Sequence, residues 1–125
     1  MHVLAKILVG LVALAHFGFL VLEMFFWQSD YALSSFNMTP EFAKSTAVLA
    51  ANQGLYNGFL AAGLAWGVIS NVRGAGISKF FLMCAIIAGG FGAATVKPTI
   101  FYVQALPAII ALLVIILTQR QSEQK

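Results

Sequence analysis

The sequence predicts an all-α integral membrane protein, a four-helix bundle whose N-terminus and C-terminus both lie in the cytoplasm. Of its 125 residues, 61% are hydrophobic and only 9% are charged, whereas soluble domains carry about 25% charged residues. Several apolar runs are long enough to cross a hydrocarbon core of about 30 Å, and short turn signals separate them. The length fits a single domain.

The first predicted span covers residues 3–27, which at ~1.5 Å per residue is enough to cross the bilayer. Lys6, placed before this run, would also suit a secretory signal peptide. The run is longer than the apolar part of a typical signal peptide, however, and no small-residue cleavage site follows it. We therefore expect a retained helix.

A polar segment follows the first span and predicts an extracytoplasmic loop and helix start over residues 28–47. Within it, Thr39 and Pro40 are typical of an N-cap followed by proline at the first helical position. The helix that starts there would be longer than a membrane is thick, so its first turns should protrude.

Three further spans are predicted over residues 48–70, 79–96 and 99–118. The glycine-containing stretch 71–78 predicts a turn between the second and third spans. Lys97 and Pro98 predict a tight connection before the fourth span, in which Pro107 removes one helical hydrogen bond.

The orientation follows from the positive charges, because cytoplasmic flanks are enriched in lysine and arginine. With the N-terminus inside, five basic residues are cytoplasmic, namely Lys6, Arg73, Lys79, Arg120 and Lys125. Two would be outside, Lys44 and Lys97. The excess of five over two favours this orientation.

The net charge of +3 comes from scattered basic residues without a cluster, so nucleic acid is not an expected partner. The single cysteine, Cys84, lies in an apolar run and predicts packing rather than a disulfide or a thiolate metal site. Small residues in the second and third spans predict that these two spans pack tightly against each other. They are Gly54, Gly58, Gly63 and Gly67, then Ala85, Gly89, Gly90, Gly92, Ala93 and Ala94.

Two ionisable residues lie within the first span, His16 and Glu23, and such residues are costly in a membrane. Because they are seven positions apart, both point to the same face of the helix. Their rise of ~10 Å along the axis is too large for sharing one ion, so neither a metal nor another cofactor is expected. Both are candidates for a catalytic acid and base.

Polar residues from other segments should lie at the level of Glu23, in the outer half of the bilayer. Asn52, Gln53 and Asn57 come from the second span, Thr95 from the end of the third, and Gln104 from the fourth. This coincidence predicts a polar pocket that opens outward, with His16 towards its floor. The predicted ligand-binding residues are Glu23, Trp27, Asn52, Gln53, Tyr56, Asn57, Tyr102 and Gln104.

The alternative is that these polar groups bond only to one another, as structural contacts between helices worth about 0.6 kcal/mol each. Glu23 would then either join such contacts or extend to the membrane interface.

Three strings resemble the bacterial family called domain of unknown function 1304: Leu22–Trp27, Ala51–Leu64 and Gln104–Ala108. The resemblance extends to His16 and the helix start at Thr39. It implies a compact, multi-pass protein of the bacterial inner membrane with four spans, and it implies no reaction or ligand.

Four functions are open on the sequence. The leading hypothesis is binding of a lipophilic or amphipathic small molecule in the pocket, as a transport or stress-response component. The alternatives are an intramembrane enzyme that moves a proton on a hydrophobic substrate, a proton-coupled exporter of the small multidrug type, and a structural subunit. The expected partners are membrane lipid and the lipophilic ligand, and a homo-oligomer stays open.

Overall fold

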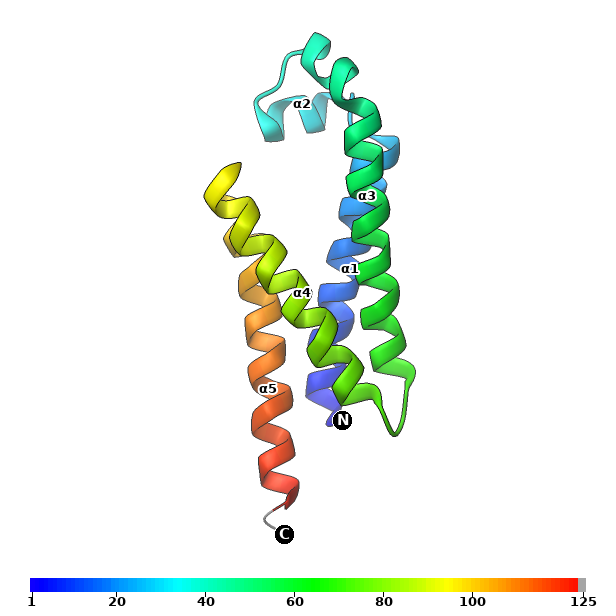
Figure 1. The fold of residues 1–125 in the computed structure, drawn as a ribbon, viewed down its shortest axis with the longest axis vertical. Coiled ribbons are helices and arrows are strands. Elements are labelled where there is room, and N and C mark those ends of the chain that lie inside the picture. The colour runs from blue at the N-terminus through cyan, green and yellow to red at the C-terminus, as the bar shows by residue number, and fades with distance from the viewer. Residues whose placement is uncertain (124–125) are drawn as a thin grey trace. The chain divides into compact units, whose positions relative to one another are not determined.

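The computed structural model describes residues 1–123, and every regular element in that part of the chain is helical. The elements are α1 (Val3–Phe25), α2 (Asp30–Phe36), α3 (Pro40–Ile69), α4 (Gly74–Thr95), the π-helix η1 (Phe101–Ala105) and α5 (Leu106–Glu123) (Figure 1). The all-α prediction is confirmed. Lys125, counted among the cytoplasmic charges, lies outside the described residues.

The chain divides into two compact units. The first comprises Met1–Ala15 and Leu60–Lys125, and the second comprises His16–Phe59. The boundary between the units therefore divides α1 and α3, and each of these helices has one part in the first unit and one in the second.

Three helices in the described part are long and apolar enough to cross a membrane: Val3–Phe25, Gly74–Thr95 and Phe101–Arg120. They match three of the four predicted spans. The predicted span 48–70 lies in α3, which is helical throughout but is not one of the three. Its amide side chains lower its mean hydropathy, and a crossing by this helix stays a prediction.

Within the polar segment after the first span, for which the sequence predicts a loop and a helix start, the short helix α2 forms. Ser29 caps it: its hydroxyl accepts a hydrogen bond of 3.3 Å from the backbone N–H of Ala32. Asn37 ends it with φ of 52°, in the left-handed region, and asparagine tolerates that conformation better than most residues.

The start of α3 is confirmed at Pro40. The Thr39 hydroxyl accepts a hydrogen bond of 3.2 Å from the backbone N–H of Phe42, as an N-cap residue should.

We expect Thr39→Ala to lower the free energy of unfolding by about 1 kcal/mol, the usual cost of removing a capping hydroxyl. Ser45→Ala is the matched control, because the Ser45 hydroxyl only donates to the Phe42 carbonyl oxygen on an exposed face. Reversible unfolding of the full chain in mixed micelles measures both variants. Equal losses would show that the cap contributes nothing particular to α3.

The structure corrects the predicted turn 71–78, because α4 already starts at Gly74. Gly67 and Gly74 let the end of α3 and the start of α4 approach each other: a Cβ on Gly74 would meet the Gly67 carbonyl oxygen. Ser78 packs against Gly67 from the next turn of α4. These glycines allow a close contact between α3 and α4, and the turn between the two helices is therefore shorter than predicted.

The fourth predicted span, 99–118, begins with the π-helix rather than with regular α-helix. In η1 the backbone N–H of Leu106 donates to the carbonyl oxygen of Phe101, five residues earlier. Pro107 follows directly, and a proline both lacks an N–H and repels the carbonyl four residues before it. The wider turn accommodates that missing hydrogen bond.

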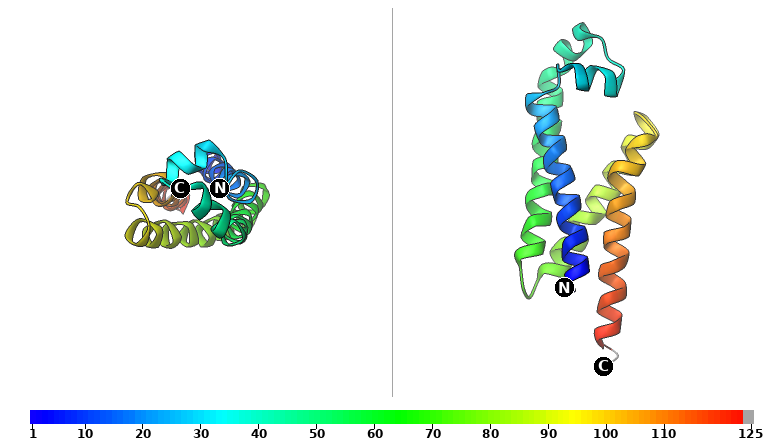
Figure 2. Two further views of the ribbon diagram at one scale, coloured as in Figure 1. Left: turned by 90° about the horizontal axis from the view of Figure 1, so that it is seen from above. Right: turned by 180° about the vertical axis from the view of Figure 1, so that it is seen from behind.

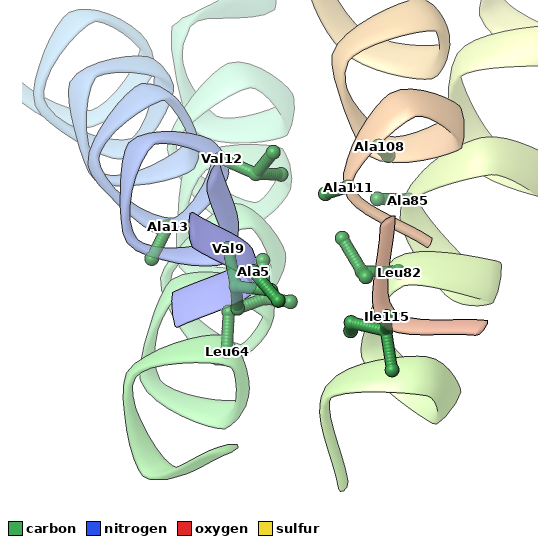
Figure 3. Packing of buried hydrophobic residues seen from close by; sticks show 10 residues of the cluster. All are labelled: Ala5, Val9, Val12, Ala13, Leu64, Leu82, Ala85, Ala108, Ala111 and Ile115. Atoms are coloured by element: carbon green, nitrogen blue, oxygen red, sulfur yellow. The ribbon is translucent and has the colours of Figure 1, made fainter. Parts of the chain in front are cut away.

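The apolar core of the first unit consists of alanine and branched aliphatic side chains (Figure 3). Its buried members are Ala5, Val9, Val12, Ala13, Leu64, Leu82, Ala85, Ala108, Ala111 and Ile115. Five of these residues are alanines, two in α1 and three in α4 and α5, and such small side chains permit the close backbone approach on which helix contacts in lipid depend.

Candidate functional site

In the second unit, α1 and α3 lie side by side, as both side views show (Figures 1 and 2). Two glycines of α3 allow the approach. A Cβ on Gly54 would lie 3.0 Å from the Cβ of Glu23 and 3.1 Å from the carbonyl oxygen of Leu20. A Cβ on Gly58 would collide with the Leu20 side chain. These two glycines were predicted to serve packing against the third span, and the structure shows them packed against α1 instead.

Asn57, one turn after Gly54, links the two ionisable residues of α1. Its side-chain oxygen Oδ1 lies 2.9 Å from Nδ1 of His16, and its Nδ2 donates to Oε2 of Glu23 at 2.7 Å. Asn57 and His16 are buried, with 6% and 1% of their surfaces exposed, and Glu23 is half-buried. One amide therefore bridges a separation of ~10 Å along α1.

The orientation of the Asn57 amide decides which nitrogen of a neutral His16 ring carries the proton. An amide oxygen can only accept, so Nδ1 of His16 carries the proton and donates it to Asn57. Turning the amide over would place its oxygen against Oε2 of Glu23, which repels it when the carboxylate is ionised. The arrangement leaves the other ring nitrogen of a neutral His16, Nε2, as an acceptor.

Nε2 of His16 is buried and has no hydrogen-bond partner among the described residues. The ring of Phe19 lies edge-on to the imidazole, with ring centroids 5.5 Å apart. Buried polar atoms in folded proteins nearly always have a partner, so an unpaired one calls for an explanation.

Trp27, another predicted ligand-binding residue, contacts residues of α2 and α3, and its part in a ligand site stays a prediction. Its Nε1 donates to the Thr46 hydroxyl at 3.1 Å, and its ring contacts that of Phe36 at a centroid distance of 5.1 Å. These contacts join the end of α1 to α2 and to the first turns of α3.

Trp27→Phe keeps the ring contact with Phe36 and removes the hydrogen bond to Thr46. We expect a loss of about 1 kcal/mol in the free energy of unfolding, the typical net worth of such a bond. Thr46→Val should cost a similar amount, and the double variant should cost no more than the larger single loss. Unfolding in mixed micelles measures this cycle, and additive losses would contradict the direct bond.

The remaining predicted site residues are not brought to Asn57 by the described contacts. In the second unit, Asn52, Gln53 and Tyr56 are exposed, and Tyr56 contacts the ring of Phe59 at 6.0 Å. Among residues 1–123, neither Asn52 nor Gln53 makes a side-chain hydrogen bond.

Two predicted residues belong to the first unit. Gln104 is half-buried within η1, and Tyr102 is exposed, with its ring edge-on to Phe101 at 5.6 Å. Their participation in one site with Glu23 stays a prediction.

Three residues around the site escaped the sequence analysis: Thr46, Phe36 and Phe19. Their side chains carry no signal of their own, although Ser29 before an acidic residue could have indicated α2 and hence Phe36. In the described chain, no three side chains of the types His, Cys, Asp and Glu come close enough to hold a metal ion.

Comparisons with known proteins identify the relatives of the chain. The family described as "Protein of unknown function (DUF1304)" matches residues 10–116, a stretch that includes His16, Glu23 and Asn57. The chain is 33% identical over 115 residues to the "Uncharacterized protein YpaA" of Lactococcus lactis subsp. lactis (strain IL1403), covering 90% of this chain and 97% of that relative. No solved structure matches. The chain belongs to the DUF1304 family of proteins of unknown function.

Proposed function

We propose that the protein crosses the bacterial inner membrane four times, with both termini in the cytoplasm. We further propose that it binds the polar head of a lipophilic or amphipathic molecule at Glu23, Asn57 and His16. The exposed residues Asn52, Gln53 and Tyr56 would contact the rest of the ligand.

The observation that carries the proposal is the hydrogen-bonded chain from Glu23 through Asn57 to His16, which ends in an unpaired acceptor. Polar groups that serve only to hold helices together gain most when all of them are satisfied. Nε2 of His16 instead has a hydrogen-bonding capacity that no described residue uses, and a molecule outside the chain would satisfy it.

The surroundings favour a lipophilic ligand. Helix α1 is apolar on both sides of these groups, with Leu14, Phe17 and Phe25 exposed on its surface. A molecule that reaches the site from lipid would place its apolar part among such side chains and its head at the polar chain.

Mass spectrometry of the purified full chain, released from native lipid, tests the binding. We expect a molecule that accompanies the wild type and the control Asn71→Leu, and that is lost from Asn57→Leu and from His16→Phe. Asn71 is exposed in the connection between α3 and α4, so its replacement matches the chemistry without touching the site. The same set of molecules in all four samples would refute the proposal.

A second function is favoured by the orientation of the His16 ring. Asn57 holds the proton on Nδ1, so the lone pair of Nε2 can take a proton from a bound substrate, as a general base does. Proton transfer on a hydrophobic substrate would make the protein an intramembrane enzyme.

Lipid extracts of cells distinguish catalysis from binding. Catalysis predicts a pair of isomers whose ratio changes when His16→Phe replaces the wild type. A ratio that stays constant while the bound molecule is lost supports binding without reaction.

A further inference from the structure

We infer that the ligand of this site is a neutral lipophilic alcohol, whose hydroxyl group donates a hydrogen bond to Nε2 of His16. The inference rests on the proposed binding function and specifies its ligand class. It is drawn from the direction of the hydrogen bonds in the site.

At the His16 end of the hydrogen-bonded chain, the one atom unpaired among the described residues is Nε2, which can accept a hydrogen bond. Oδ1 of Asn57 takes the only ring proton of neutral His16 at 2.9 Å, and Nδ2 of the same amide is directed to Glu23. Nε2 then holds a lone pair in the ring plane, on the side away from Asn57. Only a group that carries a hydrogen can complete the chain there.

This polarity excludes anionic head groups. A carboxylate or a phosphate diester offers oxygen lone pairs, which would oppose the lone pair of Nε2.

A cationic head is also poorly matched. An ammonium group at Nε2 would lie beside a neutral ring, and the nearest carboxylate in the hydrogen-bonded chain belongs to Glu23, seven residues away on α1. That spacing corresponds to ~10 Å of helical rise. Burying a charge without a close partner is far more costly than burying a hydroxyl group that is hydrogen-bonded.

The neighbours of the ring suit the apolar part of an alcohol. Phe19 lies edge-on to His16 at 5.5 Å, on the next turn of α1. Nε2 is buried, so the hydroxyl must reach it by displacing a neighbouring side chain. We therefore expect selectivity for the head group and tolerance of different chains.

Nitrogen NMR of the full chain in lipid nanodiscs, with isotope-labelled histidine rings, tests the inference. The sequence contains two histidines, so the exposed His2 is replaced in a His2→Gln background to leave only the His16 signals. The probes are dodecanol, methyl dodecyl ether, dodecylammonium and dodecanoate, which share an alkyl chain and differ in the head group.

We expect dodecanol to shift the Nε2 resonance upfield, in the direction of an accepted hydrogen bond, while Nδ1 keeps its proton. The ether is the matched control, because it has the oxygen but cannot donate. Equal shifts with dodecanol and the ether, or no shift with dodecanol, would overturn the inference.

The outcome also separates this inference from the proposed function. If dodecylammonium or dodecanoate shifts Nε2 and dodecanol does not, the head-group class is wrong while binding at the site stands. If no probe shifts Nε2 and no molecule accompanies the purified chain, both fail. The probes act on wild-type site residues, so loss of folding in a variant does not affect the result.

Discussion

Replacing Gly89 by alanine should lower the free energy of unfolding by about 1–3 kcal/mol, the cost of forcing extra volume into a packed interior. The added Cβ would lie 2.7 Å from the backbone nitrogen of Ala105 and 2.9 Å from its Cβ. Ala105 is fully buried and belongs to η1. A backbone atom cannot swing aside as a flexible side chain can, so α4 and η1 must separate.

The adjacent Gly90 provides a matched control, because a Cβ there would meet nothing within 4 Å. Gly90→Ala should be neutral or stabilising, since alanine is favoured over glycine in a helix by up to about 1 kcal/mol. Reversible unfolding of both variants in mixed micelles measures the difference. Equal effects at the two positions would contradict the contact between α4 and Ala105.

Local signals in the sequence predicted the helices well where a residue type has a single common structural role. Thr39 followed by Pro40 located the start of α3, because a hydroxyl cap and a residue without an N–H both satisfy the first turn of a helix. The apolar runs predicted the ends of the other long helices to within a few residues.

The same reasoning failed where glycine and proline have two uses. Gly74 was read as a turn residue, but it is the first residue of α4. A glycine is needed there because a Cβ would meet the carbonyl oxygen of Gly67. Pro107 was expected to weaken a helix, and the chain responded with a π-turn in η1. Neither outcome is decided by neighbours in sequence, because each depends on another segment or on a choice between helix types.

For the candidate site, the sequence predicted that His16 and Glu23 share a face, but not which amide of α3 joins them. The predicted depth in the membrane places Asn52 and Asn57 at similar heights along α3. It does not tell which of the two side chains points towards α1, because that depends on their positions around the helix axis. The signal was present in Gly54, which marks the face towards α1. Asn57 is three residues from it and shares that face, whereas Asn52 is two residues away and is exposed.

The largest effect is expected at Asn57 itself. Asn57→Leu removes both hydrogen bonds and leaves Oε2 of Glu23 and Nδ1 of His16 without partners in an apolar setting. Each abandoned group costs about 1–3 kcal/mol, so we expect a loss of at least 2 kcal/mol in the free energy of unfolding. Unfolding in mixed micelles measures it, with Asn71→Leu as the control that should change little.

Replacing the whole chain of polar groups should then separate stability from binding. The triple variant Glu23→Met, Asn57→Leu and His16→Phe removes every polar group of this hydrogen-bonded chain together, and apolar replacement of a complete polar cluster is often neutral or stabilising. We therefore expect it to regain most of the stability that Asn57→Leu loses, yet to retain no accompanying molecule in mass spectrometry. If the triple variant still carried the molecule, the polar chain would be a contact between helices and nothing more. If instead it unfolded as readily as Asn57→Leu, the loss in the single variant would reflect poor packing of leucine against α1 rather than abandoned polar groups.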